Sequence, residues 1–282
     1  MAVDQEKSQF QIVASIVLFN HSYEQVAGTL TSLLAERCVD KIVLVNNGGA
    51  DWADALNNDR ISYISAKENG GFGHGHNLAM SRYLDSCDYF LICNPDISFE
   101  VGALASLHQF ASEGKHQFVS PRIHYSDGRF QYSCRLLPTP ANLLLRRFIP
   151  RLGVKMDAAY ELQAADYDST FAVPTVSGCF MLIASPLLKK LNGFDERFFM
   201  YMEDVDLCRR ALPHSDIIYF SGAQITHVFG KGSYKNLVLL GHHVRSAVAY
   251  FCKWGWFFDR QRRQYNQQCL KSIPMKENGR KR

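Results

Sequence analysis

The sequence predicts an α/β fold with a mostly parallel central sheet flanked by helices. Short apolar runs at residues 12–19, 41–45 and 89–93 are rich in β-branched or aromatic residues, as buried parallel strands are. Helical patterns or glycine-rich loops separate these runs, so strands and helices alternate along the chain. Each run is followed directly by asparagine, which indicates a polar ligand-binding edge where the carboxyl ends of parallel strands meet.

The size and charge of the chain limit the classes of function. Its 282 residues can bury a full core, and its net charge of +4 is unevenly placed. Residues 259–282 hold eight Lys or Arg against two Asp or Glu, a charge of +6, so the rest of the chain carries −2. This distribution argues against a broad nucleic-acid-binding face and favours acidic lipid headgroups as the partner of the tail.

The cysteines and the N-terminus bear on location. The eight cysteines include no CxxC pair, which predicts free thiols in a reducing cytosol. No signal peptide and no run of 18 uncharged apolar residues is visible, so no membrane-spanning segment is expected.

The first third of the chain supplies the predicted sheet. After strand 12–19 a helix is expected over 23–38, with Val26, Leu30 and Leu33 on one stripe. Strand 41–45 ends at Asn46-Asn47, and 61–65 reads as a third strand. The glycine-rich loop 68–77 follows; it could bring backbone N–H groups to a phosphate, or it could be a flexible loop with glycine caps.

Strand 89–93 runs directly into Asn94-Pro95-Asp96. A carboxylate at this position lies in the ligand crevice of an open α/β sheet and could hold a divalent cation on a diphosphate. Read alone, the tripeptide is only a turn signal. A helix over 101–113, a strand over 118–121 and a hairpin over 124–132 follow, and 135–168 reads as an irregular acceptor-side insertion.

The segment 176–210 is the centre of the functional prediction. A buried strand is expected over 176–184, then a helix with Ser185 as cap that ends at Asn192-Gly193. An aromatic loop, 194–202, leads into a helix that starts with Glu203, Asp204 and Asp206. These acids could simply stabilise a helix N-terminus. Their aromatic surroundings instead favour proton transfer, because apolar walls raise the pKa of a carboxyl group.

Two features of the C-terminal part of the chain bear on function. His227 follows a strand and precedes a Gly-Lys-Gly-Ser loop, so it could contact a metal or phosphate or be structural. The pattern over 237–258 is helical and aromatic, which suits either an interfacial membrane helix or a helix packed on the core of the domain. Residues 261–282 are polar and basic and are expected to be frayed.

Several motifs now stand in order along the chain, and together they resemble a known family. They are Asn20, Asn46-Asn47, the loop 69–77, Asn94-Pro95-Asp96, Gly193-Phe194-Asp195-Glu196, Glu203-Asp204-x-Asp206-Leu207-Cys208-x-Arg210, and His227. This set resembles the family 2 glycosyltransferases with the GT-A (Rossmann-like) fold, in the rhamnosyltransferase-like branch of O-antigen and polysaccharide synthesis. The resemblance covers roughly residues 12–233.

The resemblance implies a donor site. Asn20, Asn46 and Asn47 fall where the family contacts the nucleotide. A second group, Asn69, Gly71 and Asn77, falls in a loop near the donor.

It also implies a metal site and a catalytic base. Asp96 matches the metal-binding acid, with Asn94 in place of the first acid of the family motif, and His227 completes the metal or diphosphate site. Asp204 matches the catalytic base, and Glu203 and Asp195 are placed on the acceptor side. The expected cofactor is Mg²⁺ or Mn²⁺.

The expected activity is inverting transfer of L-rhamnose from dTDP-rhamnose to a lipid-pyrophosphate-linked saccharide. A cation and backbone N–H groups can neutralise the leaving diphosphate, and a carboxylate can deprotonate the attacking hydroxyl. The catalytic domain is expected over 1–235 and an amphipathic helix with a basic tail over 236–282. The expected location is the cytoplasmic face of the inner membrane, as a peripheral protein.

Three alternatives stay open. A UDP-hexose transferase (galactosyl or glucosyl) would have the same fold. A sugar nucleotidyltransferase has a glycine-rich, arginine-containing loop after its first strand, and residues 19–22 contain none. A non-catalytic membrane-associated binding module would have a degraded site, against which Asp96, Asp204 and His227 argue.

Overall fold

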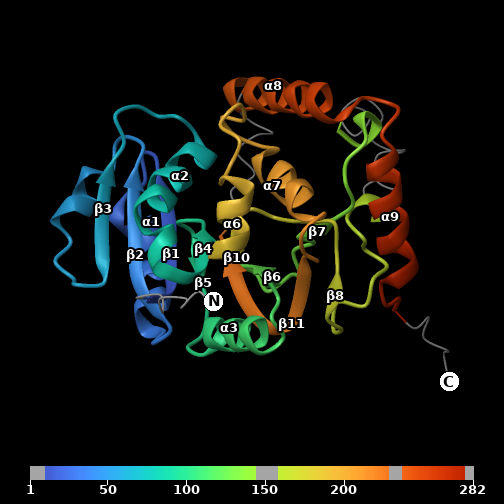
Figure 1. Cartoon of the computed structure of the whole chain (residues 1–282). Coiled ribbons are helices and arrows are strands. Elements are labelled where there is room, and N and C mark those ends of the chain that lie inside the picture. Colours follow the sequence, from blue (N-terminus) through green and yellow to red (C-terminus); the bar gives the residue numbers. More distant parts are fainter. Residues whose placement is uncertain (1–9, 144–157, 229–236, 277–282) are drawn as a thin grey trace, which may run out of the picture.

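The computed structural model describes residues 10–143, 158–228 and 237–276, and its centre is a curled sheet with helices on both faces (Figure 1). The sheet order is β3-β2-β1-β4-β10-β6-β11-β5, and β8 pairs with β11. A separate small sheet joins β7 and β9. The strands are β1 Phe10–Leu18, β2 Val39–Asn46, β3 Ile61–Ser65, β4 Cys87–Cys93, β5 Ile97–Ser98, β6 Phe118–Tyr125, β7 Cys134–Arg135, β8 Phe171–Ala172, β9 Thr175–Val176, β10 Phe180–Ala184 and β11 Ile218–His227.

The predicted α/β class with a mostly parallel sheet is confirmed. Strands β3, β2, β1 and β4 are parallel, and their register sets Leu18 beside Asn46 and Ile16 beside Cys93. The carboxyl ends of these strands therefore lie along one edge. Strand β10 runs antiparallel to both β4 and β6, so its first residues start at the edge where β4 ends.

Helices cover both faces of the sheet because successive strand residues point to opposite sides. Ile12, Ala14 and Ile16 of β1 pack in one apolar cluster with α1 and α3, while Val13 and Val17 pack in the other with α2, α6 and α7. The helices are α1 Tyr23–Ala35, α2 Phe72–Tyr83, α3 Ala103–Glu113, α6 Ser185–Leu191, α7 Glu203–Ala211, α8 Leu237–Trp254 and α9 Arg260–Ser272, with 3₁₀ turns η1 Asp51–Ala55 and η2 Leu84–Ser86.

Most predicted elements match, with small shifts at their ends. The single strand expected over 176–184 is wrong, because Thr175–Val176 form β9 of the small sheet and Phe180–Ala184 form β10 of the large sheet. The cap of α6 is Ala184 rather than Ser185, whose hydroxyl instead lies 3.2 Å from the Cys87 thiol. His227 is the last residue of β11, not part of a loop after a strand. The predicted Gly-Lys-Gly-Ser loop lies outside the described residues, as does most of the middle of the 135–168 insertion.

The C-terminal segment lies along the domain as two helices. In Figure 1, α8 crosses the top of the molecule and α9 runs down its right side. The expected frayed tail is wrong for Arg260–Ser272, because this stretch forms α9 and buries Arg262 and Cys269. A third apolar cluster joins Tyr250 and Phe251 of α8 to residues of α7 and the loop before it.

Candidate active site

The asparagines at the ends of β1 and β2 shape a polar loop. Asn46 uses both ends of its amide: Nδ2 donates to Asp51 Oδ1 (2.8 Å) and to the Tyr63 hydroxyl (2.9 Å), and Oδ1 accepts from two backbone N–H groups. Asn20 adopts a left-handed φ of 56°, and its N–H donates to the Gly48 carbonyl. Asn46 therefore fixes the shape of the loop, while Asn20 lies exposed beside it.

Asn47 joins this loop to the start of α2. Its Nδ2 donates to the Gly71 carbonyl at 2.9 Å and lies 3.4 Å from Asn69 Oδ1, which accepts the Gly71 N–H. Asn47 Oδ1 is buried and accepts no hydrogen bond from the described residues. Gly71 has φ +96°, and an added Cβ would lie 2.0 Å from the Phe199 carbonyl oxygen, so only glycine fits there. The structure thus brings five of the six residues predicted to contact the donor, apart from Asp96, into one region: Asn20, Asn46, Asn47, Asn69 and Gly71.

Asn77 lies further along α2 and holds a different segment. Its amide exchanges hydrogen bonds with the backbone of Phe194 (2.9 and 2.8 Å) and donates to Glu196 Oε1 at 2.8 Å. The Phe72 N–H donates to the Phe199 carbonyl. The start of α2 is therefore the support of the loop 194–202 that leads into α7.

Asp96 and His227 meet, as the sequence predicted for a metal site. His227 Nε2 lies 3.3 Å from Asp96 Oδ1 and 3.4 Å from the amide nitrogen of Asn94. His227 Nδ1 lies 3.2 Å from Gln131 Oε1, which orients the ring. Burial by itself lowers the pKa of His227, but Asp96 and Cys179 raise it to about 10.

These residues fit a divalent cation that also binds a diphosphate. Asp96 Oδ1 is buried, and its one contact with a polar side chain in the described part of the chain is the 3.3 Å pair with His227, so it keeps an unused lone pair. Within the same residues no group of three His, Cys, Asp or Glu is arranged to hold a metal. Such a cation would thus take Asp96 and His227 from the protein, displace the imidazole proton, and need further oxygens from the ligand.

Asp204 lies at the start of α7 and is held on both oxygens. Oδ2 accepts the Gly178 N–H at 3.0 Å, and Oδ1 accepts the Val205 N–H at 2.8 Å. The neighbouring Glu203 is buried, and its Oε2 has no hydrogen-bond partner among the described residues. Burial and the charge of Asp204 raise the pKa of Glu203 well above its ordinary value. The two adjacent acids thus have different environments, since Asp204 accepts two backbone N–H groups and Glu203 Oε2 is buried without a partner among the described residues.

Residues 178 and 179 connect the two predicted halves of the site. Gly178 donates its N–H to Asp204, and the Cys179 carbonyl accepts the Asn94 N–H at 2.9 Å. Asn94 in turn contacts His227. Asp204 and, through Asn94, His227 are therefore attached to residues 178–179, directly before β10.

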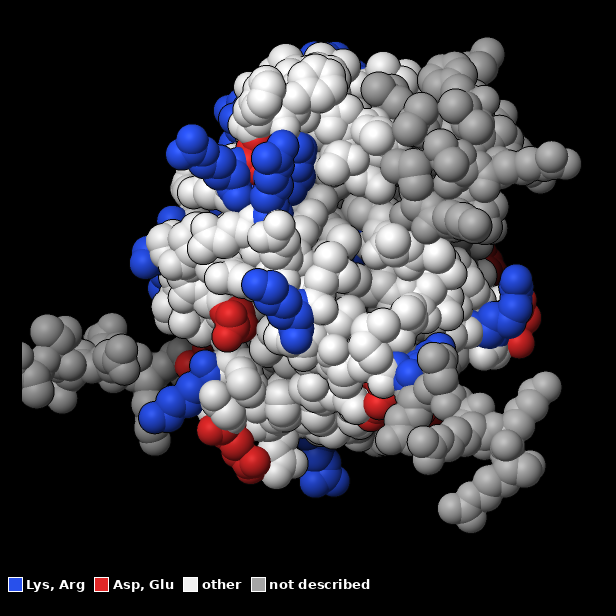
Figure 2. Space-filling model, turned by 90° about the vertical axis from the view of Figure 1, so that its right-hand side faces the viewer, with Lys and Arg blue, Asp and Glu red and all other residues white. Residues whose placement is uncertain are grey.

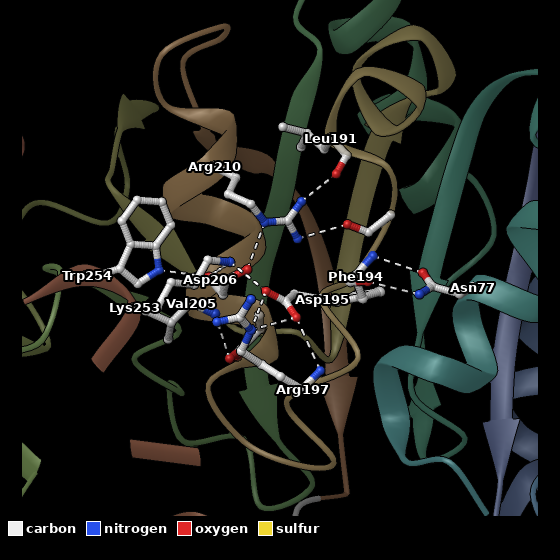
Figure 3. A network of polar contacts seen from close by, with 12 residues as sticks. Asn77, Leu191, Phe194, Asp195, Arg197, Val205, Asp206, Arg210, Lys253 and Trp254 are labelled. Carbon is white, nitrogen blue, oxygen red and sulfur yellow. Dashed lines mark hydrogen bonds and ion pairs between the residues drawn. The ribbon is translucent and has the colours of Figure 1, made fainter. Parts of the chain in front are cut away.

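Asp195 and Asp206 belong to a polar network beneath the site (Figure 3). The Lys253 ammonium of α8 lies 2.7 Å from Asp195 Oδ2 and 2.7 Å from Asp206 Oδ1. Asp206, which has no exposed surface on its side chain, also pairs with Arg210 at 2.7 Å and accepts the Trp254 indole N–H. Arg210 donates to the Leu191 and Gly193 carbonyls. Asp195 was predicted on the acceptor side; in the structure it is already paired with Lys253 and Arg197.

This pairing alters the titration of Asp195. Burial raises its pKa, but hydrogen bonds from Lys253 and Arg197 outweigh burial and lower the pKa to about 2. A depressed pKa means that the network contributes stability above the ordinary pKa of an aspartate and loses it as the pH falls toward 2.

Comparison with known proteins decides the family. The model of glycosyl transferase family 2 matches residues 14–179, more than half of the chain. The chain belongs to glycosyl transferase family 2. The matched range includes the asparagine loop, α2, Asp96 and Gly178, so the resemblance inferred from the motifs is confirmed.

Curated members of this family share part of the chain at modest identity. The hexosyltransferase Agl10 of low-salt glycan biosynthesis in Haloferax volcanii is 25% identical over 70% of this chain and 61% of its own. Rhamnosyltransferase WbbL of Escherichia coli is 29% identical over 53% of this chain and 57% of its own. An N-acetylglucosaminyl-diphospho-decaprenol L-rhamnosyltransferase of Mycobacterium tuberculosis is 27% identical over 70% and 68%. The chain thus spans about three fifths of the first two relatives.

Solved structures agree with a GT-A fold. GalNAc-T7 with UDP, GalNAc and Mn²⁺ has a TM-score of 0.59 at 12% identity and covers 78% of this chain and 43% of its own. Mannosyltransferase PcManGT of Pyrobaculum calidifontis with GDP-Man and Mn²⁺ has a TM-score of 0.57 at 14% identity and covers 88% and 65%. At these identities the likeness shows the fold alone.

Sequence reasoning missed some residues of this family 2 site. Asp206 and Arg210 are four residues apart on one helix, a spacing that predicts an ion pair and could have been used. Lys253 lies in a helix more than forty residues further on, and nothing local shows that it reaches Asp195 and Asp206.

Proposed function

We propose that this chain is an inverting glycosyltransferase that uses a nucleotide-diphosphate sugar, with L-rhamnose from dTDP-rhamnose as the sugar transferred. The proposed acceptor is a lipid-pyrophosphate-linked saccharide in cell-surface polysaccharide synthesis. The observation that carries the proposal is the attachment of Asp204 and, through Asn94, of His227, which pairs with Asp96, to residues 178–179 in a family 2 domain. Two relatives named as rhamnosyltransferases support the sugar.

The residues have separate tasks in this proposal. Asp204 takes the proton of the attacking hydroxyl, and a single displacement inverts the anomeric carbon. Asp96 and His227 hold a divalent cation, Mg²⁺ or Mn²⁺, which neutralises charge on the leaving diphosphate. The exposed Asn20 and the glycine-rich start of α2 offer contacts to the nucleotide and sugar of the donor.

A UDP-hexose transferase is the second candidate. It is favoured by the relative that is named a hexosyltransferase, which aligns over 70% of this chain. The two candidates share every residue role given above and differ only in the donor, so a donor screen separates them.

The first prediction concerns the donor and the cation. The purified protein should bind one of dTDP-rhamnose, UDP-galactose, UDP-glucose, UDP-N-acetylglucosamine and GDP-mannose in calorimetry, with Mn²⁺ or Mg²⁺ present, and EDTA should abolish the binding. Asp96→Asn should weaken cation-dependent binding at least about 100-fold, because even outer-shell partners of a metal contribute 10- to 100-fold.

The control for this measurement is Asp127→Asn, in an exposed turn where Asp127 pairs with Arg129. It should leave binding unchanged. Tight donor binding that persists both in EDTA and in the Asp96 variant would rule out the cation role. If the folded protein binds none of the donors, even with a lipid-linked acceptor present, the result would favour the non-catalytic binding module.

We also propose that the protein is peripheral on the cytoplasmic face of the inner membrane. No helix in residues 10–143, 158–228 or 237–276 is long and apolar enough to span a bilayer. One side of α8 packs on the domain through Tyr250 and Phe251. The helix also exposes Val238, Val244 and Val248. Both readings of this helix from the sequence therefore find support.

The turn between α8 and α9 supplies the strongest candidate anchors. Phe258 is 93% exposed and Phe257 is 69% exposed, and the exposed Arg260 and Arg263 follow at once. Figure 2 shows the side of the molecule that lies at the right in Figure 1, where Lys and Arg side chains gather beside uncharged surface. Apolar anchors beside cations suit an interface with anionic lipid.

The second prediction tests this surface. The double variant Phe257→Ser, Phe258→Ser should bind vesicles of anionic phospholipid at least about 10-fold more weakly in a flotation assay. The reason is that two phenylalanine side chains are no longer available to insert into the bilayer. Val101→Ser, which removes an exposed valine near α3 at the other end of the molecule, is the control. Equal flotation of both variants would contradict the proposal. Deleting residues 237–282 is a poorer test, because it also removes Lys253 and Tyr250 from the domain.

A further inference from the structure

Three adjoining hollows lie around the start of α9, and Arg263 lines all of them. One, of about 690 Å³, lies between the end of α8 and the start of α9, where Lys253 and Arg260 line it. A second, of about 400 Å³, continues along α9 to Lys271. The third, of about 540 Å³, lies between α9 and residues 136–141. We call the first two together the basic hollow and the third the apolar groove.

The basic hollow carries positive charge that the chain does not neutralise. Asp259, the one acid among its described lining residues, is paired with the buried Arg209 at 2.7 Å. Arg260, Arg263 and Lys271 are exposed, and none of their side chains forms a hydrogen bond or an ion pair with a residue that the structure describes. The hollow is therefore suited to an anion.

Arg260 and Arg263 lie next to each other within this hollow. Residues three apart on a helix are neighbours on its surface, so the two guanidinium groups can reach one ligand together. Each guanidinium has a planar fork of N–H donors that matches a phosphate. Two such groups side by side fit two linked phosphates, and an anion between them would relieve their mutual repulsion.

The apolar groove continues from these arginines. Its walls include Trp256, Phe257 and Leu270. Phe257 is 69% exposed and Leu270 is 52% exposed, so apolar surface of the groove faces solvent, and covering it with a hydrocarbon chain would be favourable. Because Arg263 lines both the groove and the basic hollow, a chain in the groove has its head beside the guanidinium groups.

We propose that the apolar groove and the basic hollow together bind the lipid diphosphate of the acceptor, with the diphosphate between Arg260 and Arg263. This inference rests on the proposed function, in which the acceptor is linked to a lipid pyrophosphate. One groove and two adjacent guanidinium groups fit one chain and two phosphates, whereas a bilayer phospholipid has two acyl chains and one phosphate. The groove opens at Phe257, one of the two proposed bilayer anchors, so a lipid chain can enter it from the membrane.

The basic hollow borders the helix that carries the base. Arg209 of α7 lines the hollow and lies five residues after Asp204, about 7.5 Å further along the helix axis. Lys253 lines it too and pairs with Asp206 of α7 at 2.7 Å. A saccharide attached to a diphosphate in the hollow can therefore extend along α7 toward Asp204.

The test titrates the full chain with decyl diphosphate, a single-chain lipid diphosphate without sugar or nucleotide, below its critical micelle concentration. EDTA is present so that no cation holds the ligand at Asp96. Arg263→Gln should weaken binding about 10- to 100-fold, the range of a hydrogen bond to a charged group. The matched control is Arg82→Gln, at an exposed arginine of α2, and it should leave binding unchanged, as should Asp96→Asn.

Two further ligands test the two parts of the site. Inorganic diphosphate, which has no chain, should bind at least about 10-fold more weakly than decyl diphosphate, and Leu270→Asn should weaken binding of the decyl compound alone. Dihexanoylphosphatidylglycerol, which lacks the second phosphate, should also bind at least about 10-fold more weakly. Equal binding of inorganic and decyl diphosphate would remove the chain from the groove. Equal or tighter binding of the phospholipid would assign the groove to the bilayer and overturn the acceptor assignment.

Nucleotide-sugar binding with Mn²⁺ is measured on the same variants and should be unchanged in Arg263→Gln. If the chain binds a donor but no decyl diphosphate, or binds decyl diphosphate equally well in Arg263→Gln, the lipid site is overturned and the proposed transfer stands. If decyl diphosphate binding depends on Arg263 while no donor binds, the lipid site stands and the proposed transfer fails. Thermal unfolding of each variant confirms that it is folded.

Discussion

Asp204→Asn should leave nucleotide-sugar binding intact and lower kcat at least about 100-fold, because general bases contribute 10²- to 10⁴-fold and an amide cannot accept the proton. The substitution keeps the size of the side chain and an oxygen that can accept the Gly178 N–H. The measurement is kcat with saturating donor and acceptor, together with donor binding by calorimetry. Transfer at the wild-type rate would remove Asp204 from the role of base.

The adjacent acid provides the matched control. Glu203 is buried, and its raised pKa means that it is protonated to higher pH than an ordinary glutamate. Glu203→Gln therefore copies the neutral form and should keep most of the activity. If Glu203→Gln lost activity and Asp204→Asn kept it, the roles of the two acids would have to be exchanged.

Lys253→Met should destabilise the domain by about 3 kcal/mol, at the lower end of the cost of breaking a buried ion pair. The ammonium lies 2.7 Å from both Asp195 and Asp206, and Asp206 has no exposed surface on its side chain. For a chain of this size the loss corresponds to a decrease of Tm by roughly 5–10 °C. The expected structural consequence is a looser contact of α8 with α7, the helix that begins at Glu203 and Asp204.

A surface lysine serves as the control for Lys253. Lys189 pairs with Asp85 at 2.8 Å, but the two side chains are 45% and 96% exposed. Lys189→Met should therefore change the stability by less than about 1 kcal/mol. Lys253→Arg should recover part of the loss because it restores the charge. Similar Tm values for Lys253→Met and Lys189→Met would show that the network does not stabilise the domain.

The sequence allowed the class of the fold and the centre of the site to be predicted, because both depend on local patterns. Apolar runs in the sequence predicted β1, β2 and β4, and Asp96 lies three residues after the end of β4. Parallel strands bring their carboxyl ends together, so Asp96 could be placed at the binding edge before its partner was known. The acids at the start of α7 could also be predicted, because they form a local pattern at the beginning of a helix.

What could not be predicted depends on contacts between distant segments. Strand β10 lies between β4 and β6 and runs antiparallel to both, and nothing local in residues 180–184 shows this. Helix α9 is polar along most of its length, and its buried residues are Arg262 and Cys269. In a polar and basic stretch of sequence, these two residues give no sign that they are buried or that the stretch is helical. The pairing of Lys253 with Asp195 joins residues 58 positions apart.

In the proposed transfer, the segment formed by Gly178 and Cys179 would set the distance between Asp204 and the residues that hold the leaving diphosphate. A displacement at carbon requires the attacking oxygen and the leaving oxygen to lie on a line through the carbon, and their separation is the same for any hexose. Asp204 and the backbone of Asn94 are hydrogen-bonded to consecutive residues of the chain, so the backbone sets the spacing of these two residues. An added Cβ at Gly178 would lie 3.0 Å from the Asp204 Cβ, so Asp204 would have to shift by a few tenths of an ångström. Under the proposed function, sugar preference could therefore change in the surrounding loops while the spacing of Asp204 and Asn94 stays constant.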